Sequence, residues 1–181
     1  MPRKGTKMEH LAIVPVRPEQ AAELAALAKP IWEEHFTPII GAAQVAYMLE
    51  KFQSERELRE QMELEGYRYY FFLWDGEKAG YMGLRCDADA LFLSKLYLKK
   101  EFRGRKISRA ALKFMQDVCR RENLGKIWLT CNKYNSNSLA VYRALGFVTA
   151  RSQVSDIGGG FAMDDYVLER RVAAPNAPPF G

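Results

Sequence analysis

Three consecutive β-type segments occupy the middle of the chain, and segments with helical periodicity lie on both sides of them. The first is an aromatic run at 67–74, Asp75-Gly76 is a hairpin turn signal, and the return segment covers 79–86. A third strand is expected at 90–98. This order predicts a mixed α/β (α+β) fold, in which a mixed sheet carries helices on both faces.

The rest of the chain divides into further predicted elements. Strands are expected at 8–16, 126–131, 147–154 and 165–171, and helices at 19–29, 42–52, 54–64, 103–124 and 135–145. Pro30 is expected to interrupt the first helix, and Gly158-Gly159-Gly160 to form a flexible turn. We expect one domain at 8–172, between a flexible N-terminus at 1–7 and an unstructured tail at 173–181.

Composition is that of an ordinary globular protein and excludes several classes. Of 181 residues 48% are hydrophobic, and 27 Lys and Arg against 22 Asp and Glu give a net charge of +5. No apolar run approaches the roughly 18–20 residues that span a bilayer, and Glu9 and His10 stand where a secretory signal would need apolar residues. Cys86, Cys119 and Cys131 form neither a disulfide framework nor a metal-ligand set. We expect no membrane span, no bound metal and a reducing, cytoplasmic location.

Positive charge gathers where the strand at 90–98 runs into the next helix. Between Lys95 and Arg109 there are seven basic residues and a single acid, Glu101. Free N–H groups and the macrodipole make a helix N-terminus an anion site, and Gly104 lets the backbone approach a ligand. The segment therefore predicts a ligand that carries phosphate. A solvated basic loop that caps the helix is the alternative.

A second segment with a recognisable pattern covers 135–147. Asn135 is a suitable N-cap, Leu139 and Tyr142 share one helix face, and Gly146 stands where a helix normally ends. Taken alone, Tyr142 is best interpreted as a packed aromatic residue.

In this order and at this separation, the two segments resemble the GNAT superfamily of acetyl-CoA-dependent N-acyltransferases. The first is similar to its pyrophosphate loop, Arg/Gln-x-x-Gly-x-Gly/Ala, which follows the fourth strand. The second is similar to the pattern Asn-x-x-Ala-x-x-x-Tyr-x-x-x-Gly-Phe, with Ser138 in the Ala place. The resemblance covers about 8–172 and implies the GNAT fold, with a mostly antiparallel sheet of about seven strands, and acetyl-CoA as co-substrate.

The resemblance also implies roles for individual residues. The backbone of Leu96, Tyr97 and Leu98 would bind the pantetheine arm and the acetyl carbonyl. The loop formed by Arg103, Gly104, Arg105, Lys106, Ile107 and Ser108 would hold the pyrophosphate, with Arg109 as a further donor. Asn135 would contact the CoA arm, and Tyr142 would protonate the leaving thiolate. Glu101, Lys106 and Ser108 depart from the family pattern, and we expect the Lys106 ammonium to bind phosphate.

These roles imply transfer of acetyl from acetyl-CoA to a primary amine by direct attack. No covalent enzyme intermediate is expected, so the three cysteines have no nucleophilic role. Glu33, Glu34, His35 or a water chain are the candidates for the general base.

The acceptor is the least determined part of the sequence analysis. The segments 47–52 and 158–168 resemble the PaiA-type branch, which is associated with spermidine and spermine acetylation. Carboxylates that would attract a cationic amine are Glu33, Glu34, Glu50, Glu55, Glu57, Asp164 and Asp165. Together they favour a polyamine acceptor, although such acids can also form a solvated helix face.

Alternatives stay open at this point. They are a protein or peptide N-acetyltransferase, an aminoglycoside N-acetyltransferase, and a non-catalytic module that binds acyl-CoA or nucleic acid. The aromatic strand at 67–74 is apolar on both faces and typical of buried core, which argues against nucleic-acid binding. The expected partner is a small-molecule amine, with no membrane, and a homodimer is left open.

Overall fold

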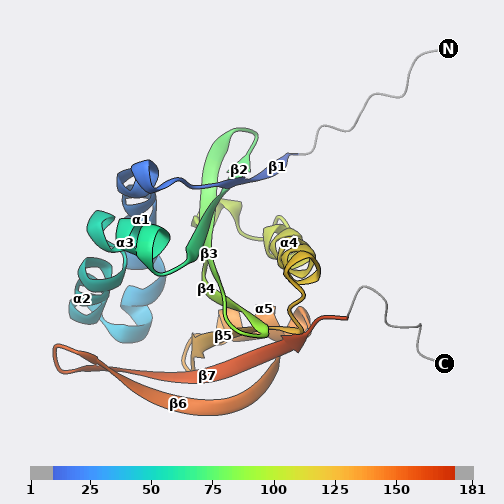
Figure 1. The fold of residues 1–181 in the computed structure, drawn as a ribbon. Coiled ribbons are helices and arrows are strands. Elements are labelled where there is room, and N and C mark those ends of the chain that lie inside the picture. The colour runs from blue at the N-terminus through green and yellow to red at the C-terminus, as the bar shows by residue number, and fades with distance from the viewer. Residues whose placement is uncertain (1–9, 174–181) are drawn as a thin grey trace.

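The computed structural model describes residues 10–173, which fold around a single seven-stranded sheet (Figure 1). The strands are β1 (Leu11–Pro15), β2 (Tyr67–Trp74), β3 (Glu77–Cys86), β4 (Ala90–Leu98), β5 (Lys126–Asn132), β6 (Val148–Gly158) and β7 (Phe161–Arg171). Their order is β1-β2-β3-β4-β5-β7-β6, and only β4 and β5 pair in parallel. The predicted mixed, mostly antiparallel sheet is confirmed. The N-terminus at 1–7 and the tail from 174 on lie outside the described residues.

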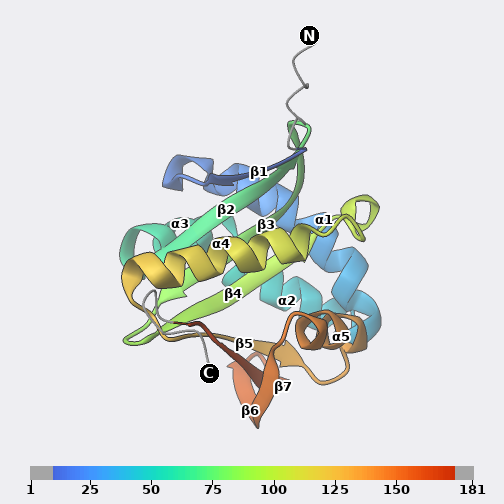
Figure 2. The same cartoon turned by 90° about the vertical axis from the view of Figure 1, so that its right-hand side faces the viewer.

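Helices cover both faces of this sheet. The helices α1 (Ala21–Ile40), α2 (Ala42–Phe52) and α3 (Glu55–Leu64) lie on one side, and α4 (Ile107–Glu122) lies on the other (Figure 1). The short α5 (Ser136–Ala144) lies beside β5 and β7, toward the end of the molecule where α4 begins (Figure 2). No helix among residues 10–173 is long and apolar enough to cross a membrane.

The aromatic strand β2 supplies side chains to two separate cores. Tyr69 and Phe71 are buried against α1, α2 and α3, whereas Phe72 belongs to the core under α4. Successive residues of a strand point to opposite faces, so a run of aromatic residues can fill both cores at once. These rings are consequently not available as a stacking surface for nucleic-acid bases.

Pro30 does not interrupt the first helix, so that prediction was wrong. α1 runs through both Pro30 and Pro38. A proline leaves the carbonyl four residues earlier without its helical N–H donor, which normally breaks a helix. Here those carbonyls belong to Ala26 and Glu34, which are exposed, as are both prolines. Water can replace the missing donors, and the buried face of the helix is unaffected.

The parallel pair β4–β5 is joined only at its beginning. The register pairs Ala90–Phe92 with Lys126–Trp128 and stops there. From Leu93 on, the two strands part in the middle of the sheet. Backbone groups along this opening have no partner in the neighbouring strand, so they are available to a ligand. The opening is the place where the resemblance expected the pantetheine arm.

Two further boundaries differ from prediction. α4 begins at Ile107 rather than near Arg103, because Gly104 and Lys106 adopt positive φ angles of 78° and 63°, outside the helical region. β7 begins at Phe161 rather than at 165, and Gly158 is the last residue of β6, so Gly159 and Gly160 form a two-residue hairpin turn. Tyr47 of α2 donates a hydrogen bond of 2.7 Å to the Ile157 carbonyl beside this turn. The glycine turn is therefore tied to α2.

Candidate active site

A cavity of about 410 Å³ lies where the end of β4, the beginning of α4 and α5 come together. Most of the residues predicted to bind the cofactor line it: Leu96, Tyr97, Leu98, Arg103, Gly104, Lys106, Ile107, Ser108 and Arg109, together with Tyr142. We call it the cofactor cavity. The sequence analysis gave no cofactor contact to Ile31 and His35 of α1, of which His35 was named only as a candidate base, and none to Asn137, Ser138, Val141, Ala144 and Leu145 of the α5 region. The helical spacing of the last group was a usable signal for one face.

The basic residues of the loop before α4 have different environments. Arg103 donates to Glu34 of α1 at 2.7 Å and to the Leu98 carbonyl at 3.1 Å, so its guanidinium already joins the loop to α1 and β4. Arg105 does not line the cofactor cavity and lies over the rings of Trp74 and Phe102, 5.1 Å from each centroid.

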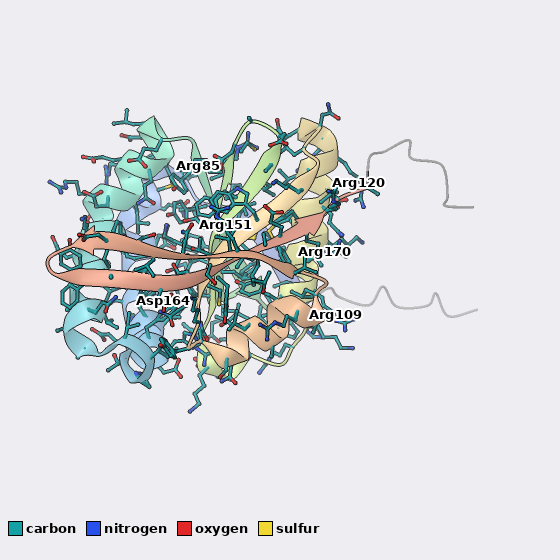
Figure 3. All side chains as sticks on the ribbon, turned by 90° about the horizontal axis from the view of Figure 1, so that it is seen from below. Arg85, Arg109, Arg120, Arg151, Asp164 and Arg170 are labelled. Carbon is teal, nitrogen blue, oxygen red and sulfur yellow. The ribbon has the colours of Figure 1, made fainter. Side chains whose placement is uncertain are left out.

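Lys106 and Arg109 are the basic residues best placed for an anion. Both line the cofactor cavity, and neither forms an ion pair with another residue between 10 and 173. Arg109 lies in the first turn of α4 (Figure 3), where the helix dipole also favours negative charge. Two cationic side chains, the positive φ of Gly104 and a helix N-terminus therefore converge on one cavity, as a pyrophosphate group requires.

A second cavity, of about 310 Å³, lies between the sheet and the helices α1, α2 and α3. Its walls include Trp32 and Phe36 of α1, Lys95 of β4, and Asp165 of β7. We call it the acceptor cavity. Asn135 lines this cavity and not the cofactor cavity, and its side chain accepts a hydrogen bond of 3.4 Å from the Ser138 N–H, as the N-cap of α5. Its predicted contact with the CoA arm stays a prediction.

The two cavities share four residues: Leu96, Tyr97, Ser138 and Tyr142. Tyr142 packs edge-on against Phe147, with 5.6 Å between the ring centroids. Desolvation by the surrounding protein raises the pKa of its hydroxyl, which is therefore fully protonated at neutral pH. A proton donor thus stands at the boundary between the cavities.

The acceptor cavity contains one carboxylate, Asp165, which is only 6% exposed. Its Oδ1 atom has no hydrogen-bond partner among the described residues. Desolvation, followed by repulsion from Asp164, raises the pKa of Asp165 to about 6. Asp164 itself forms an ion pair with Lys133 at 2.5 Å. A buried and unpaired carboxylate with a raised pKa is typical of a group that accepts protons.

The other candidates for the base lie elsewhere. Glu33 is exposed and lines neither cavity. Glu34 is held by Arg103, a hydrogen bond that lowers the pKa of its carboxyl. His35 lines the cofactor cavity, and desolvation lowers its pKa. Glu50, Glu55 and Glu57 do not line the acceptor cavity either. The sequence analysis named Asp165 only as one of several acids that would attract a cationic amine.

The cysteines are unsuited to covalent catalysis. Desolvation raises the pKa of Cys119 to about 11 and that of Cys131 to about 12, and it also raises the pKa of Cys86. The nucleophile of cysteine is the thiolate, which is scarce at neutral pH in each case. Among residues 10–173 there is also no group of three or more His, Cys, Asp or Glu residues that could hold a metal ion.

The position of Lys106 allows a test of the departure from the family pattern. We expect Lys106→Gly to weaken acetyl-CoA binding about 3- to 10-fold, because glycine keeps the positive φ but removes one phosphate donor. Lys106→Arg should stay near wild-type affinity. Titration calorimetry at two salt concentrations measures both variants. Equal affinity in Lys106→Gly and wild type would show that the ammonium does not contact phosphate.

Fold and site together indicate an enzyme with two adjoining cavities at the opening between β4 and β5, of which the one beside α4 is suited to a ligand that carries phosphate. The model of the acetyltransferase (GNAT) family matches residues 29–147. An uncharacterised N-acetyltransferase from the pepI 3′ region of Lactobacillus delbrueckii subsp. lactis is 25% identical over 171 residues, which cover 90% of this chain and 98% of the relative.

Solved structures resemble this fold. The PaiA N-acetyltransferase from Thermoplasma acidophilum, in complex with coenzyme A, has a TM-score of 0.72 at 19% identity and covers 89% of this chain and 98% of its own. A mutant of the spermidine N-acetyltransferase SpeG from Vibrio cholerae has a TM-score of 0.64 at 14% identity, and the match covers 90% of this chain and 94% of the SpeG chain. Because the family model matches more than half of the chain, the chain belongs to the GNAT family of acetyltransferases. Its co-substrate is acetyl-CoA, and the cofactor cavity fits the phosphates of that molecule.

Proposed function

We propose that this GNAT enzyme transfers the acetyl group to a primary amine that enters the acceptor cavity. The observation that carries the proposal is the shared wall: Tyr97 and Tyr142 line both cavities, at the opening between β4 and β5. A donor on one side and an amine on the other would meet there. Acetyl-CoA supplies an activated thioester, and the chain's own residues hold the reactants together and move protons.

Asp165 is the proposed general base. A primary amine with an ordinary pKa near 10 arrives as an ammonium ion and must lose a proton before it can attack. An ammonium ion beside Asp165 would provide the partner that the Oδ1 atom lacks, and the carboxylate would then accept the proton. Tyr142 is the proposed general acid, and its hydroxyl would return a proton to the leaving thiolate. The two groups lie in one cavity. After the amine attacks, its nitrogen loses a second proton, which would restore the Tyr142 hydroxyl, and Asp165 would release the first proton to solvent, so that one proton is released per turnover.

Direct transfer is proposed, with no acetylated enzyme as an intermediate. The high thiol pKa values of Cys119 and Cys131 support this step. Cys131 lines the acceptor cavity, so it is the cysteine to monitor. Mass spectrometry of the enzyme with acetyl-CoA and no amine should find no acetyl group on any cysteine, whereas a stoichiometric acetyl-cysteine would contradict direct transfer.

Polyamines are one acceptor class to include in the test. PaiA and SpeG resemble this chain in fold, and SpeG is a spermidine N-acetyltransferase. The carboxylate of Asp165 in the acceptor cavity supports a cationic amine. The acids on α1, α2 and α3 add no support, because none of them lines the cavity.

A CoA-release screen tests the proposed function. It should compare polyamines, amino acids, peptides and aminoglycosides at low and high salt, and at least one amine class should release CoA well above the background rate. A thermal shift assay separates the binding-module alternatives, since a ligand at about 100 times its Kd should stabilise the fold by about 2.7 kcal/mol. Stabilisation by acetyl-CoA without CoA release from any amine would indicate a non-catalytic acyl-CoA binder. Stabilisation by an oligonucleotide alone, lost with salt, would indicate a nucleic-acid binder.

A further inference from the structure

Lys95 is a buried lysine in the wall of the acceptor cavity. Lys95 is only 7% exposed. Its Nζ atom donates a hydrogen bond to Ser94 Oγ at 3.0 Å and lies 3.5 Å from Gln61 Oε1. The same atom lies 5.3 Å from the ring centroids of Tyr67 and Tyr69. No acidic residue between 10 and 173 forms an ion pair with it. The amine is therefore surrounded by neutral dipoles and aromatic faces.

A β-bulge directs this side chain into the cavity. The register between β3 and β4 shifts at Gly83, which pairs with Lys95, while the next residue, Leu84, pairs with Leu93. Ser94 is the extra residue, so Ser94 and Lys95 both line the acceptor cavity although neighbouring strand residues normally point to opposite faces. Without the bulge, Lys95 would point into the apolar core under α4. Bulges that redirect a side chain are frequent beside active sites.

Gly83 makes room for the contacts of Lys95. A Cβ atom at Gly83 would lie 2.8 Å from the Tyr69 ring, so only glycine lets this ring pack there. The Tyr69 hydroxyl in turn donates to Gln61 Oε1 at 2.5 Å, the amide oxygen nearest to the lysine. The position of Lys95 is thus supported by β2, β3 and α3 together.

Burying a cation without a carboxylate is costly, and proteins retain such groups mostly where a ligand uses them. On the basis of the proposed function, we propose that Lys95 binds an anionic group of the acceptor, and that the preferred acceptor is a primary amine that also carries a carboxylate. Lys95 lies against α3 and β2, whereas Asp165 lies on β7 beside Asn132. The two charges face the cavity from different walls, as an acceptor with a cation and an anion requires.

The titration of Lys95 is consistent with this arrangement. Desolvation lowers its pKa to about 7, attraction by Glu65 raises it, and repulsion by Arg85 lowers it further. The faces of Tyr67 and Tyr69 complete its surroundings. A bound carboxylate would favour the ammonium form, so binding should take up a proton near pH 7 and above.

Matched acceptors test the proposal. The acceptors are a monoamine, an aminocarboxylate and a diamine with the same four-carbon chain: butylamine, 4-aminobutanoate and putrescine. Homologues with two to six carbons are included, so that one of them matches the distance across the cavity. For wild type, we expect kcat/KM of the best aminocarboxylate to exceed that of the matching monoamine and diamine about 10- to 100-fold. Lys95→Met should raise KM for the aminocarboxylate far more than KM for the monoamine, so that the preference is lost. Lys113→Met, on the exposed side of α4, is the matched control.

Binding gives a readout that does not depend on acetyl transfer. Pentanoate, which has no amine, should raise the unfolding midpoint of wild type at pH 6.5 and should not raise that of Lys95→Met. Lys95→Met should fold. Its unfolding midpoint should be higher than that of wild type, and this difference should be larger at pH 7 than at pH 10. The cost of the buried ammonium is fully present below about pH 7 and disappears as pH rises toward the ordinary lysine value of about 10.5.

The outcomes separate the two proposals. An unchanged aminocarboxylate preference in Lys95→Met, or a wild-type preference for diamines, would overturn the role of Lys95 while the acetyltransferase function stands. If the enzyme acetylates none of the amines, the proposed function is overturned. In that case, a rise in the unfolding midpoint with pentanoate that occurs only in proteins with Lys95 would still support the anion site. An equal pentanoate effect in wild type and Lys95→Met would overturn it.

Discussion

Tyr142→Phe is expected to lower kcat by about 10²- to 10⁴-fold while the protein still folds and binds acetyl-CoA normally. The ring packs edge-on against Phe147, and phenylalanine preserves that packing. Only the hydroxyl is lost, at the boundary of the two cavities, so the leaving thiolate would lose its proposed proton donor. Stopped-time CoA-release assays at saturating substrates measure kcat, and calorimetry measures the affinity for acetyl-CoA.

Tyr134→Phe is the matched control for this experiment. Tyr134 is 72% exposed and lines neither cavity, so the same loss of a hydroxyl should leave kcat unchanged. An unchanged kcat in Tyr142→Phe would assign Tyr142 to packing alone. A large rise in the Kd of acetyl-CoA would instead indicate a binding role.

Asp165→Asn is expected to lower kcat/KM for the amine by a similar factor of about 10²- to 10⁴-fold. The wild-type profile should fall as pH drops through about 6, because protonated Asp165 neither attracts the ammonium nor accepts its proton. In Asp165→Asn this acid limb should disappear. Asp164→Asn is the comparison, since Asp164 lies outside the lining of the acceptor cavity. It should keep the acid limb and shift it to lower pH, because repulsion from Asp164 contributes to the raised pKa of Asp165. A wild-type pH profile in Asp165→Asn would exclude Asp165 as the base.

The stability of the same variant gives an independent check. The folded pKa of Asp165 is raised above the ordinary value of about 4, so ionisation of this residue destabilises the fold at pH values above about 6. The penalty is absent below about pH 4, where the group is protonated in both states. Asp165→Asn should therefore raise the unfolding midpoint at pH 8 and change it little at pH 4. A lower midpoint at pH 8 would mean that the carboxylate is stabilised by its surroundings.

The cofactor half of the site was largely predictable because its residues are contiguous. Gly104, Lys106 and Arg109 follow one strand and begin one helix, and local backbone chemistry is enough to indicate an anion site. Tyr142 was found through a second short pattern. The positive φ of Lys106 was not predicted, since a lysine gives no signal for that conformation. This conformation delays the start of α4 to Ile107.

The acceptor half was much less predictable because its residues come from distant parts of the chain. Trp32, Lys95 and Asp165 meet only after α1, β4 and β7 have packed. The orientation of Lys95 depends on a register shift, and a strand pattern of period two would have placed it on the opposite face. The continuity of α1 across Pro30 depends on which side of the helix is exposed, which also requires the tertiary structure.

The parted strands have a consequence for how the family can diversify. The cofactor cavity is lined mostly by β4, the beginning of α4 and α5, whereas the acceptor cavity also takes wall residues from the N-terminal helices and from Ile157, Met163 and Asp165. The last three lie past residue 147, where the match to the family model ends. Substitutions in the N-terminal helices and in the segment after residue 147 can therefore change which acceptor is bound, while the residues around the cofactor cavity stay suited to acetyl-CoA.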